Sequence, residues 1–463
     1  MERTRRGLGS ALAAVVVGLV AAWIAWSRLG AVARGTGWAE DGGVFLRERL
    51  ALGPVDVLLR PYAGYLHLVP RLVVDLALLP PVRDYALVVS ATCCLLTGAV
   101  CAAVFLLARD AVPAWPLRLL LAAVPVLLPV APWEVSGNAA NLHTFALVLA
   151  PWLFAYRARS WWSASVLAVV AVLVGLTEAQ AVLFLPLLVL AWLPRPTGTD
   201  RGRRLLALPV TVAALAAGSA QVVTALSTSR LAPRGHPTVP DVVAGWLLQT
   251  IGGLWDADVA AVARAVVAHG WWVVAVPGAL VLVVVLLGVV VALRDGRWRT
   301  ALFTLALAVG AAAVWTAALV ANASADGRWS QTTPAALVTA TPSRYAAGAG
   351  MLLATAVLVA AAALVDRVVV PGTSGRRAVV RASRPGGPSR VVLAAAGWCV
   401  VAVVVASWVG NVPGVAQRSA GPAWAPQITR AEAHCRADPA ADVVVRTEPW
   451  AAAVPCSLVL RDR

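Results

Sequence analysis

Residues 8–33 read LGSALAAVVVGLVAAWIAWSRLGAVA, a run of apolar and small side chains that a single charged residue, Arg28, interrupts. The run exceeds the ~20 apolar residues that a membrane-spanning helix needs. It is too long for the core of a signal peptide and lacks a clean cleavage site, so we expect a retained membrane anchor. Arg3, Arg5 and Arg6 precede it. Basic residues on this flank favour a cytoplasmic N-terminus.

The composition of the whole chain extends this interpretation. Of its 463 residues, 60% are hydrophobic and only 13% are charged, against about 25% charged residues in soluble domains. So few charges cannot cover the surface of a water-soluble protein of this size, so lipid must solvate much of it. We therefore predict an all-α, polytopic transmembrane bundle of about eleven helices. After the first run, the predicted spans are 85–108, 117–132, 142–156, 161–176, 179–194, 204–226, 271–293, 300–321, 346–365 and 391–409.

The distribution of charge predicts how this bundle is oriented. The net charge is +16, and every one of the 38 basic residues is Arg. Twenty of these Arg, but only five of the 22 acidic residues, fall in the segments on the N-terminal side of the predicted bundle. This is the positive-inside pattern of membrane proteins, whereas a nucleic-acid-binding protein would carry its Arg on one soluble face. We therefore expect a cytoplasmic N-terminus and no nucleic-acid partner.

The same topology places the long polar segments on the extracytoplasmic side. They are residues 34–84, 227–269, 322–345 and 410–463. We expect a transmembrane domain over 1–409, whose first outer loop is 34–84, followed by an extracytoplasmic tail over 410–463. The Gly/Pro/Arg-rich segment 371–390 is typical of a linker. Cys435 and Cys456 both lie in the tail, where an oxidising compartment favours a disulfide between them.

The first outer loop carries the most unusual sequence, GWAEDGGVF over residues 37–45. Glu40 and Asp41 are adjacent acids directly after the first span, and neighbours on a helix do not face the same way. At most one of them is therefore expected to point into a site, and the other can serve as a cap. The following glycines permit a tight turn or the close approach of a ligand. We expect a short amphipathic helix over 44–50 and an interfacial helix over 66–79, which at 14 residues spans only ~21 Å.

These residues carry a resemblance to a known class of enzymes. The acidic pair in WAEDG (38–42), with PYAGYLH (61–67) downstream in the same loop, resembles the GT-C class of membrane glycosyltransferases. The same stretches are similar to uncharacterised actinobacterial membrane proteins of that type. The resemblance also covers the predicted topology of most of the chain. It implies a multi-pass protein of a bacterial plasma membrane that acts in building the cell envelope.

The resemblance implies an inverting transfer of a sugar from a polyprenyl-phosphate donor to a glycan, lipid or protein acceptor. Asp41 would be the general base, with Glu40 as the alternative, and some members bind a divalent metal at this acid. The leaving polyprenyl phosphate needs a nearby cation. Arg344, beside Tyr345 at the mouth of the tenth predicted span, is the first candidate for that cation, and Arg328 is the second.

Other polar residues of the outer side are candidates for substrate binding. The segment 133–143, WEVSGNAANLH, contributes several hydrogen-bonding groups, and two further candidates lie in other outer loops. Each has an ordinary alternative, since loop Asn, His and Glu residues often cap helices or turns. Trp38, Trp133 and Trp329 are candidates to stack on a sugar ring. The candidate substrate-binding residues are His67, Glu134, Asn138, Asn141, His143, Glu178, Arg328, Arg344 and Tyr345.

Two rival functions remain open. Ion-coupled carriers usually bury ionisable groups in the middle of their spans, and the central parts of several long spans here have none. No inverted repeat is evident, which also favours an enzyme. A lipid or glycolipid transporter with a smooth groove, and a non-catalytic membrane protein of envelope assembly, stay as alternatives.

Overall fold

The computed structural model describes residues 2–193, 203–230, 233–323, 328–365, 388–412 and 414–461. Within these ranges the helices and one two-stranded sheet near the C-terminus are joined by turns and irregular loops. Most of the linker predicted over 371–390 lies outside the described residues, which resume at Pro388. The prediction of a mainly α-helical fold is therefore confirmed.

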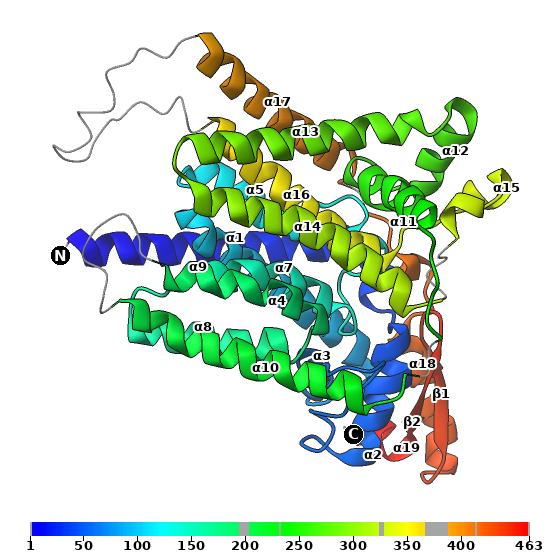
Figure 1. Cartoon of the computed structure of the whole chain (residues 1–463). Coiled ribbons are helices and arrows are strands. Elements are labelled where there is room, and N and C mark those ends of the chain that lie inside the picture. Colours follow the sequence, from blue (N-terminus) through cyan, green and yellow to red (C-terminus); the bar gives the residue numbers. More distant parts are fainter. Residues whose placement is uncertain are drawn as a thin grey trace.

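Seven helices among the described residues are long and apolar enough to cross a membrane, as expected of a multi-pass membrane protein. They extend across the molecule between its two ends (Figure 1). Each corresponds to one of the predicted spans. They are α1 (Glu2–Arg34), α4 (Tyr85–Leu107), α10 (Leu208–Ser227), α13 (Trp272–Arg294), α14 (Trp298–Ala321), α16 (Arg344–Val365) and α17 (Pro388–Gly410).

The other four predicted spans correspond to shorter helices. These are α5 (Trp115–Leu127), α7 (Leu142–Ala155), α8 (Trp161–Gly175), and a 3-10 helix over Ala179–Leu187 that continues into α9 (Leu188–Trp192). At 1.5 Å per residue, a helix of 13 to 15 residues reaches only about 20–23 Å, less than the ~30 Å hydrocarbon core. The count of eleven spans therefore stays a prediction.

Small residues allow these helices to pack closely. Every residue of α16 from Ala346 to Val365 is buried, and α16 contacts α5, α7, α13, α14 and α17. Where α1 crosses α4, a Cβ added to Gly98 would lie 2.3 Å from the carbonyl oxygen of Gly18. Backbones that approach this closely are typical of membrane helices, because lipid gives no hydrophobic drive and packing has to supply the attraction.

Arg28, the one charged residue in the first apolar run, binds backbone carbonyl groups that lack a partner within their own helix. Its guanidinium donates to the carbonyl oxygens of Val126 and Leu128 at the end of α5, and to that of Asn411. Pro125 lies inside this last turn of α5, and the carbonyls at a helix end have no partner within the helix. Arg28 is thus a structural residue.

One end of the bundle gathers the short basic loops. Arg159 pairs with Asp110 at 2.9 Å, and Arg299 donates to the carbonyl oxygens of Leu190 and Leu193. The N-terminal part of α1 lies at this same end, on the left of Figure 1. The structure therefore separates the Arg-rich loops from the acid-bearing loops at the other end of the bundle.

The opposite end, which we call the loop end, carries the short elements of the long polar segments. The interfacial helix predicted over 66–79 is α3, and the helix predicted over 44–50 is a π-helical turn, Asp41–Leu46, that continues into α2. The elements of the loop end are α2 (Arg47–Leu52), α3 (Leu68–Ala77), α6 (Ala131–Glu134), α11 (Val239–Gly245), α12 (Val259–His269), α15 (Pro334–Leu337), α18 (Trp424–Ala437), β1 (Asp442–Arg446), β2 (Ala451–Pro455) and α19 (Cys456–Val459).

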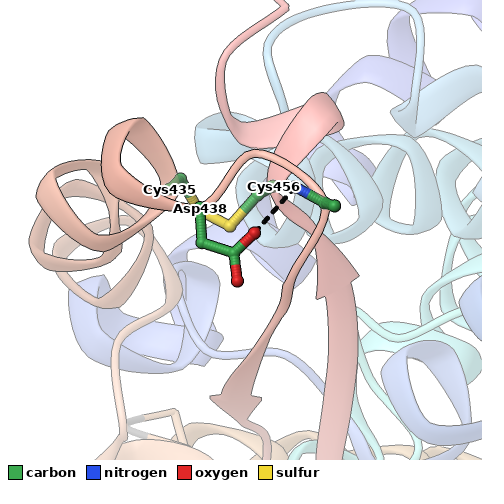
Figure 2. The surroundings of a disulfide bond; sticks show 4 residues. Cys435, Asp438 and Cys456 are labelled. Atoms are coloured by element: carbon green, nitrogen blue, oxygen red, sulfur yellow. Dashed lines mark hydrogen bonds between the residues drawn. A yellow bond between two sulfur atoms is a disulfide. The ribbon is translucent and has the colours of Figure 1, made fainter.

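The C-terminal tail folds into α18 followed by an antiparallel β1–β2 hairpin and α19. Cys435 of α18 and Cys456 of α19, the pair proposed from the sequence, form a disulfide (Figure 2). Asp438 closes the turn after α18, where its Oδ1 accepts a hydrogen bond from the amide of Ala440 at 3.2 Å. The disulfide therefore ties α18 to the end of the hairpin.

This tail packs on the first outer loop. The amide of Ala39 donates to the carbonyl oxygen of Glu448, and the amide of Glu448 donates to that of Gly37, both at 2.9 Å. These bonds make a parallel bridge between Trp38 and Glu448. The indole of Trp424 is fully buried and donates to the carbonyl oxygen of Val82 at 2.8 Å. The tail therefore fixes the backbone that carries Glu40.

Candidate functional site

Two cavities open at the loop end and share one wall. The first, which we call the span cavity, measures about 320 Å³ and reaches the apolar surface of α14 and α16. The second, which we call the loop cavity, measures about 750 Å³ and is lined mainly by the loops and the tail. Glu40, Arg344 and Tyr345 line both cavities.

The shared wall is held by a cluster of three charges. Arg344 Nη1 lies 3.2 Å from Glu40 Oε1 and 3.3 Å from Glu134 Oε1. The guanidinium also lies beside the Tyr345 ring, 5.3 Å from its centroid. Burial raises the pKa of Glu134 and the positive charge of Arg344 opposes this. One cation thus serves two largely buried carboxylates.

One oxygen of Glu40 remains without a partner. Its side chain is only 8% exposed, and Oε2 is buried with no hydrogen-bond partner among the described residues. An unpaired buried carboxylate oxygen is costly, so such atoms are usually satisfied by water, an ion or a substrate. Glu40 is therefore a cavity-lining acid whose second oxygen has no partner among the described residues.

Asp41 occupies a different place from its neighbour. Its side chain is 1% exposed and lines neither cavity. Oδ2 accepts a hydrogen bond from the amide of Ala139 at 2.9 Å, and Oδ1 from that of Ala140 at 2.8 Å. Burial raises the pKa of Asp41 to about 7, although these two bonds oppose the shift. The carboxylate links the first outer loop to the loop that precedes α7.

His143 and Glu178 form a second acid–base pair, in the span cavity. His143 Nδ1 lies 2.5 Å from Glu178 Oε2. The other oxygen of Glu178 accepts the amide of Gln180 at 2.6 Å. Because the carboxylate is the acceptor, His143 carries a proton on Nδ1, and its second nitrogen is the one available to a ligand. A carboxylate that orients an imidazole in this way is a common arrangement of general bases.

His67 also lines the span cavity, within a group of aromatic rings. Its Nδ1 donates to the carbonyl oxygen of Tyr65 at 3.2 Å, and the centroids of the His67 and Tyr65 rings are 4.0 Å apart. Burial, followed by the nearby His143, holds the pKa of His67 well below its usual range. A neutral imidazole with its proton on Nδ1 leaves Nε2 as a hydrogen-bond acceptor. His67 is therefore suited to hold a hydroxyl group.

The asparagines of the 133–143 segment mostly hold that segment together. Asn138 donates to the carbonyl oxygen of Glu134 at 2.6 Å and accepts the amide of Asn141 at 2.9 Å. Asn141 lines the span cavity, whereas Asn138 and Trp133 line neither cavity. The segment therefore offers Glu134, Asn141 and His143 to the cavities.

Three further predicted residues lie together in the loop cavity. Arg328, Trp38 and Trp329 line the loop cavity. The sequence predicted that Asp41, Glu178 and Arg344 converge on one cavity. Glu178 and Arg344 line the span cavity, whereas Asp41 lines neither cavity and its neighbour Glu40 takes its place. Within the described residues, no group of three or more His, Cys, Asp or Glu side chains is arranged to hold a metal ion.

Sequence reasoning missed several residues of this site. Arg418 of the tail is buried and donates to the carbonyl oxygens of Ser136 and Gly137, and its charge acts on Asp41. Tyr65 and Arg230 line the span cavity, and Trp450 lines the loop cavity. Tyr65 lies in the quoted PYAGYLH stretch and could have been singled out. No local signal in the sequence marks Arg418 or Trp450.

The glycines after Asp41 have a specific reason in the structure. A Cβ on Gly42 would lie 2.7 Å from Thr447 Cγ2, and one on Gly43 would lie 3.0 Å from Trp450 Cε3. The close approach that we expected of a ligand is thus made by the tail.

The arrangement combines a partly satisfied carboxylate, a cation that bridges two acids, an imidazole–carboxylate pair and an apolar wall continuous with the spans. It can take a proton from a hydroxyl group and stabilise an anion beside a lipid chain. No protein-family model, curated protein or solved structure matches this chain.

Proposed function

We propose that this protein is a membrane glycosyltransferase that moves a sugar from a polyprenyl-phosphate donor to an acceptor on the extracytoplasmic face. The observation that carries the proposal is the shared wall, where Glu40 keeps an unpartnered oxygen beside the guanidinium of Arg344. The positive-inside pattern supports an extracytoplasmic loop end. The span count of eleven belongs to this proposal, with the four short helices inserted beside the long ones.

In the proposed reaction, Glu40 takes the proton from an acceptor hydroxyl as its oxygen attacks the anomeric carbon. The bond between that carbon and the phosphate oxygen breaks, and its electron pair leaves with the polyprenyl phosphate. Arg344 binds the phosphate, which competes with Glu40 for the guanidinium and leaves the carboxylate free to accept the proton. An Arg fork suits a phosphate in this role.

The span cavity supports a lipid-linked donor. One of its walls is Val314, Ala317, Ala318 and Ala321 of α14, and Leu147 of α7 faces the same space. These small and apolar side chains belong to helices that continue into the predicted membrane, so an isoprenoid chain has a surface to follow. In this proposal Glu40 is the general base. Asp41, which was the first choice of base from the sequence, is a positioning residue.

The test is transfer by the purified full chain in nanodiscs, supplied with polyprenyl-phosphate sugars and candidate acceptors. General acid–base groups typically contribute ~10²–10⁴-fold in rate, so Glu40→Gln should lose about that factor. Asp56→Asn, an exposed acid in the same loop, is the matched control. Transfer that survives unchanged in Glu40→Gln and in Asp41→Asn would overturn the catalytic assignment.

One observation favours the transporter alternative. A further cavity of about 340 Å³ lies at the Arg-rich end, lined by Trp152 of α7 and Phe303 of α14 among others. The same two helices line the span cavity. A carrier needs a binding site at each end of the same helices. Movement of a glycolipid across the membrane of proteoliposomes, without any sugar transfer, would therefore favour that function.

A further inference from the structure

The loop cavity is built jointly by the tail and two loops. The tail contributes Gln417, Pro449 and Trp450, the first outer loop contributes Trp38 to Glu40, and the loop before α16 contributes Arg328, Trp329 and Ser343. Three indole rings therefore line one cavity at the loop end. Indole faces are broad and apolar and pack well against the C–H faces of sugar rings.

Each of these rings is held in place by its own contacts. Trp450 packs over Gly43, and Trp38 lies in the bridge with Glu448. Trp329 packs against Gly245, where an added Cβ would lie 2.3 Å from its ring. Its neighbour Ser330 donates its amide and its hydroxyl to Asp241, at 3.1 and 2.5 Å. The cavity is thus preformed.

Three polar atoms of residues that line the cavity lack a hydrogen-bond partner in the part of the chain that the structure describes, which points to a ligand. Trp38 and Trp329 are only 3% and 7% exposed, and the Nε1–H group of each is buried without a hydrogen-bond partner among the described residues. The Oε2 atom of Glu40 is in the same condition. Two unused donors and one unused acceptor complement hydroxyl groups, which both accept and donate.

The charges of the cavity narrow the class of ligand. Among the described residues, its charged side chains are Glu40, Glu134, Arg328 and Arg344, whose charges balance. Such a lining gives no net attraction to a polyanion. The apolar α14 residues that line the span cavity are absent from its lining among the described residues. The volume of about 750 Å³ lies within the range of ~300–1,000 Å³ typical of small-molecule sites.

We infer that the loop cavity binds a neutral carbohydrate, which enters as the acceptor and presents a hydroxyl to Glu40 across the shared wall. Trp450, from the tail, forms the outer platform, and Trp38 and Trp329 donate to sugar hydroxyls. The role as acceptor rests on the proposed function, whereas carbohydrate binding does not. The tail thereby becomes part of the binding site.

The experiment measures binding without transfer. Mannotriose, maltotriose and chitotriose serve as neutral probes, with sialyllactose as an anionic one, and binding to the purified full chain in nanodiscs is followed by saturation-transfer NMR and tryptophan fluorescence. Loss of one aromatic platform is expected to weaken Kd about tenfold. Trp450→Ala tests the platform, and Trp329→Phe keeps the ring but removes the N–H. Trp162→Ala, at an exposed site on α8, is the matched control.

Binding of a neutral probe that is weakened by Trp450→Ala and by Trp329→Phe, and unchanged in Trp162→Ala, supports the inference. Binding of no probe, equal binding by all variants, or a preference for sialyllactose would overturn it. The two proposals fail separately. If Glu40→Gln loses transfer but the Trp variants keep normal carbohydrate binding and acceptor KM, the proposed function holds and the carbohydrate site in the loop cavity is wrong. If carbohydrate binding depends on the Trp residues but no transfer is found, the carbohydrate site holds and the proposed function is wrong.

Discussion

Arg344 Nη1 and Glu40 Oε1 lie 3.2 Å apart, although 304 residues separate them in the chain. The pair joins the mouth of α16 to the first outer loop, and it forms the wall between the two cavities. Glu134 pairs with the same guanidinium. Removing Arg344 should therefore have a larger effect on stability than removing the charge of Glu40.

Arg344→Ala should destabilise the protein more than Glu40→Gln. The first change leaves Glu40 and Glu134 without their cation, whereas the second leaves Arg344 paired with Glu134. Losing a charged hydrogen-bond partner costs roughly 1.5–3 kcal/mol, and Arg344→Lys should restore much of that stability. Thermal unfolding in detergent measures the order of the three variants. An Arg344→Ala protein as stable as Glu40→Gln would contradict the shared-cation arrangement.

The stability of the wild-type protein should fall as the pH rises toward neutrality because of Asp41. Burial raises the pKa of this carboxyl to about 7 in the folded state, above the usual value of ~3.9 in an unfolded chain. Its contribution is thus fully present below the unfolded pKa and is lost as the pH rises through about 7. Unfolding midpoints between pH 4 and 8 should slope downward in wild type and flatten in Asp41→Asn. Asp56→Asn should keep the wild-type slope.

The His143–Glu178 pair should matter for turnover more than for folding. Glu178→Gln keeps a hydrogen-bond acceptor for His143 but removes the charge that orients the imidazole. We expect kcat to fall by ~10-fold or more, as for other groups that assist proton transfer, with a shifted pH profile. A pH–rate profile identical to that of wild type would assign the pair a purely structural role.

Gly42→Ala should loosen the tail from the first outer loop. The added Cβ would lie 2.7 Å from Thr447 Cγ2, and overpacking of this kind costs roughly 1–3 kcal/mol. Thr447→Ser removes that methyl group and keeps the hydroxyl, so the double variant should regain stability. Limited proteolysis of the tail reports the loosening. No recovery in the double variant would mean that the strain arises elsewhere.

The orientation can be checked by labelling with a membrane-impermeant maleimide. A cysteine placed at Val444, an exposed tail residue, should react in intact cells. One placed at Ser160, an exposed residue at the Arg-rich end, should react only after lysis. The opposite result would invert the topology and place the proposed site in the cytoplasm.

The long helices were predictable because their signal is local. The run 346–365 contains only apolar and small residues in a window that lies within α16, and hydropathy alone finds it. Three of the four short helices begin and end within two residues of the predicted spans, and only the span predicted over 117–132 ends clearly early, at Leu127. The 3-10 helix over Ala179–Leu187 has the composition of a span, and no local pattern distinguished it from an α-helix.

The sequence predicted at which end of the bundle the site lies, but not which side chains face the cavities. Charge sorting placed Glu40, Asp41, Glu178 and Arg344 at one end. Glu40, Glu178 and Arg344 line the span cavity there, but Asp41 does not. Whether Glu40 or Asp41 faces the cavity depends on the π-helical turn that begins at Asp41, which sequence spacing does not reveal. Arg418 and Trp450 belong to the site only because the tail returns to the first loop.

The bridge between Trp38 and Glu448 also sets an order of events in biosynthesis. A ribosome makes Trp38 410 residues before Glu448 (448 − 38). The segment that carries Glu40 therefore cannot reach its final geometry until Glu448 has been made and has come to lie beside the first outer loop. A product that terminates between these two residues would leave the first outer loop without this partner, so the geometry of the acid depends on a segment that is synthesised much later.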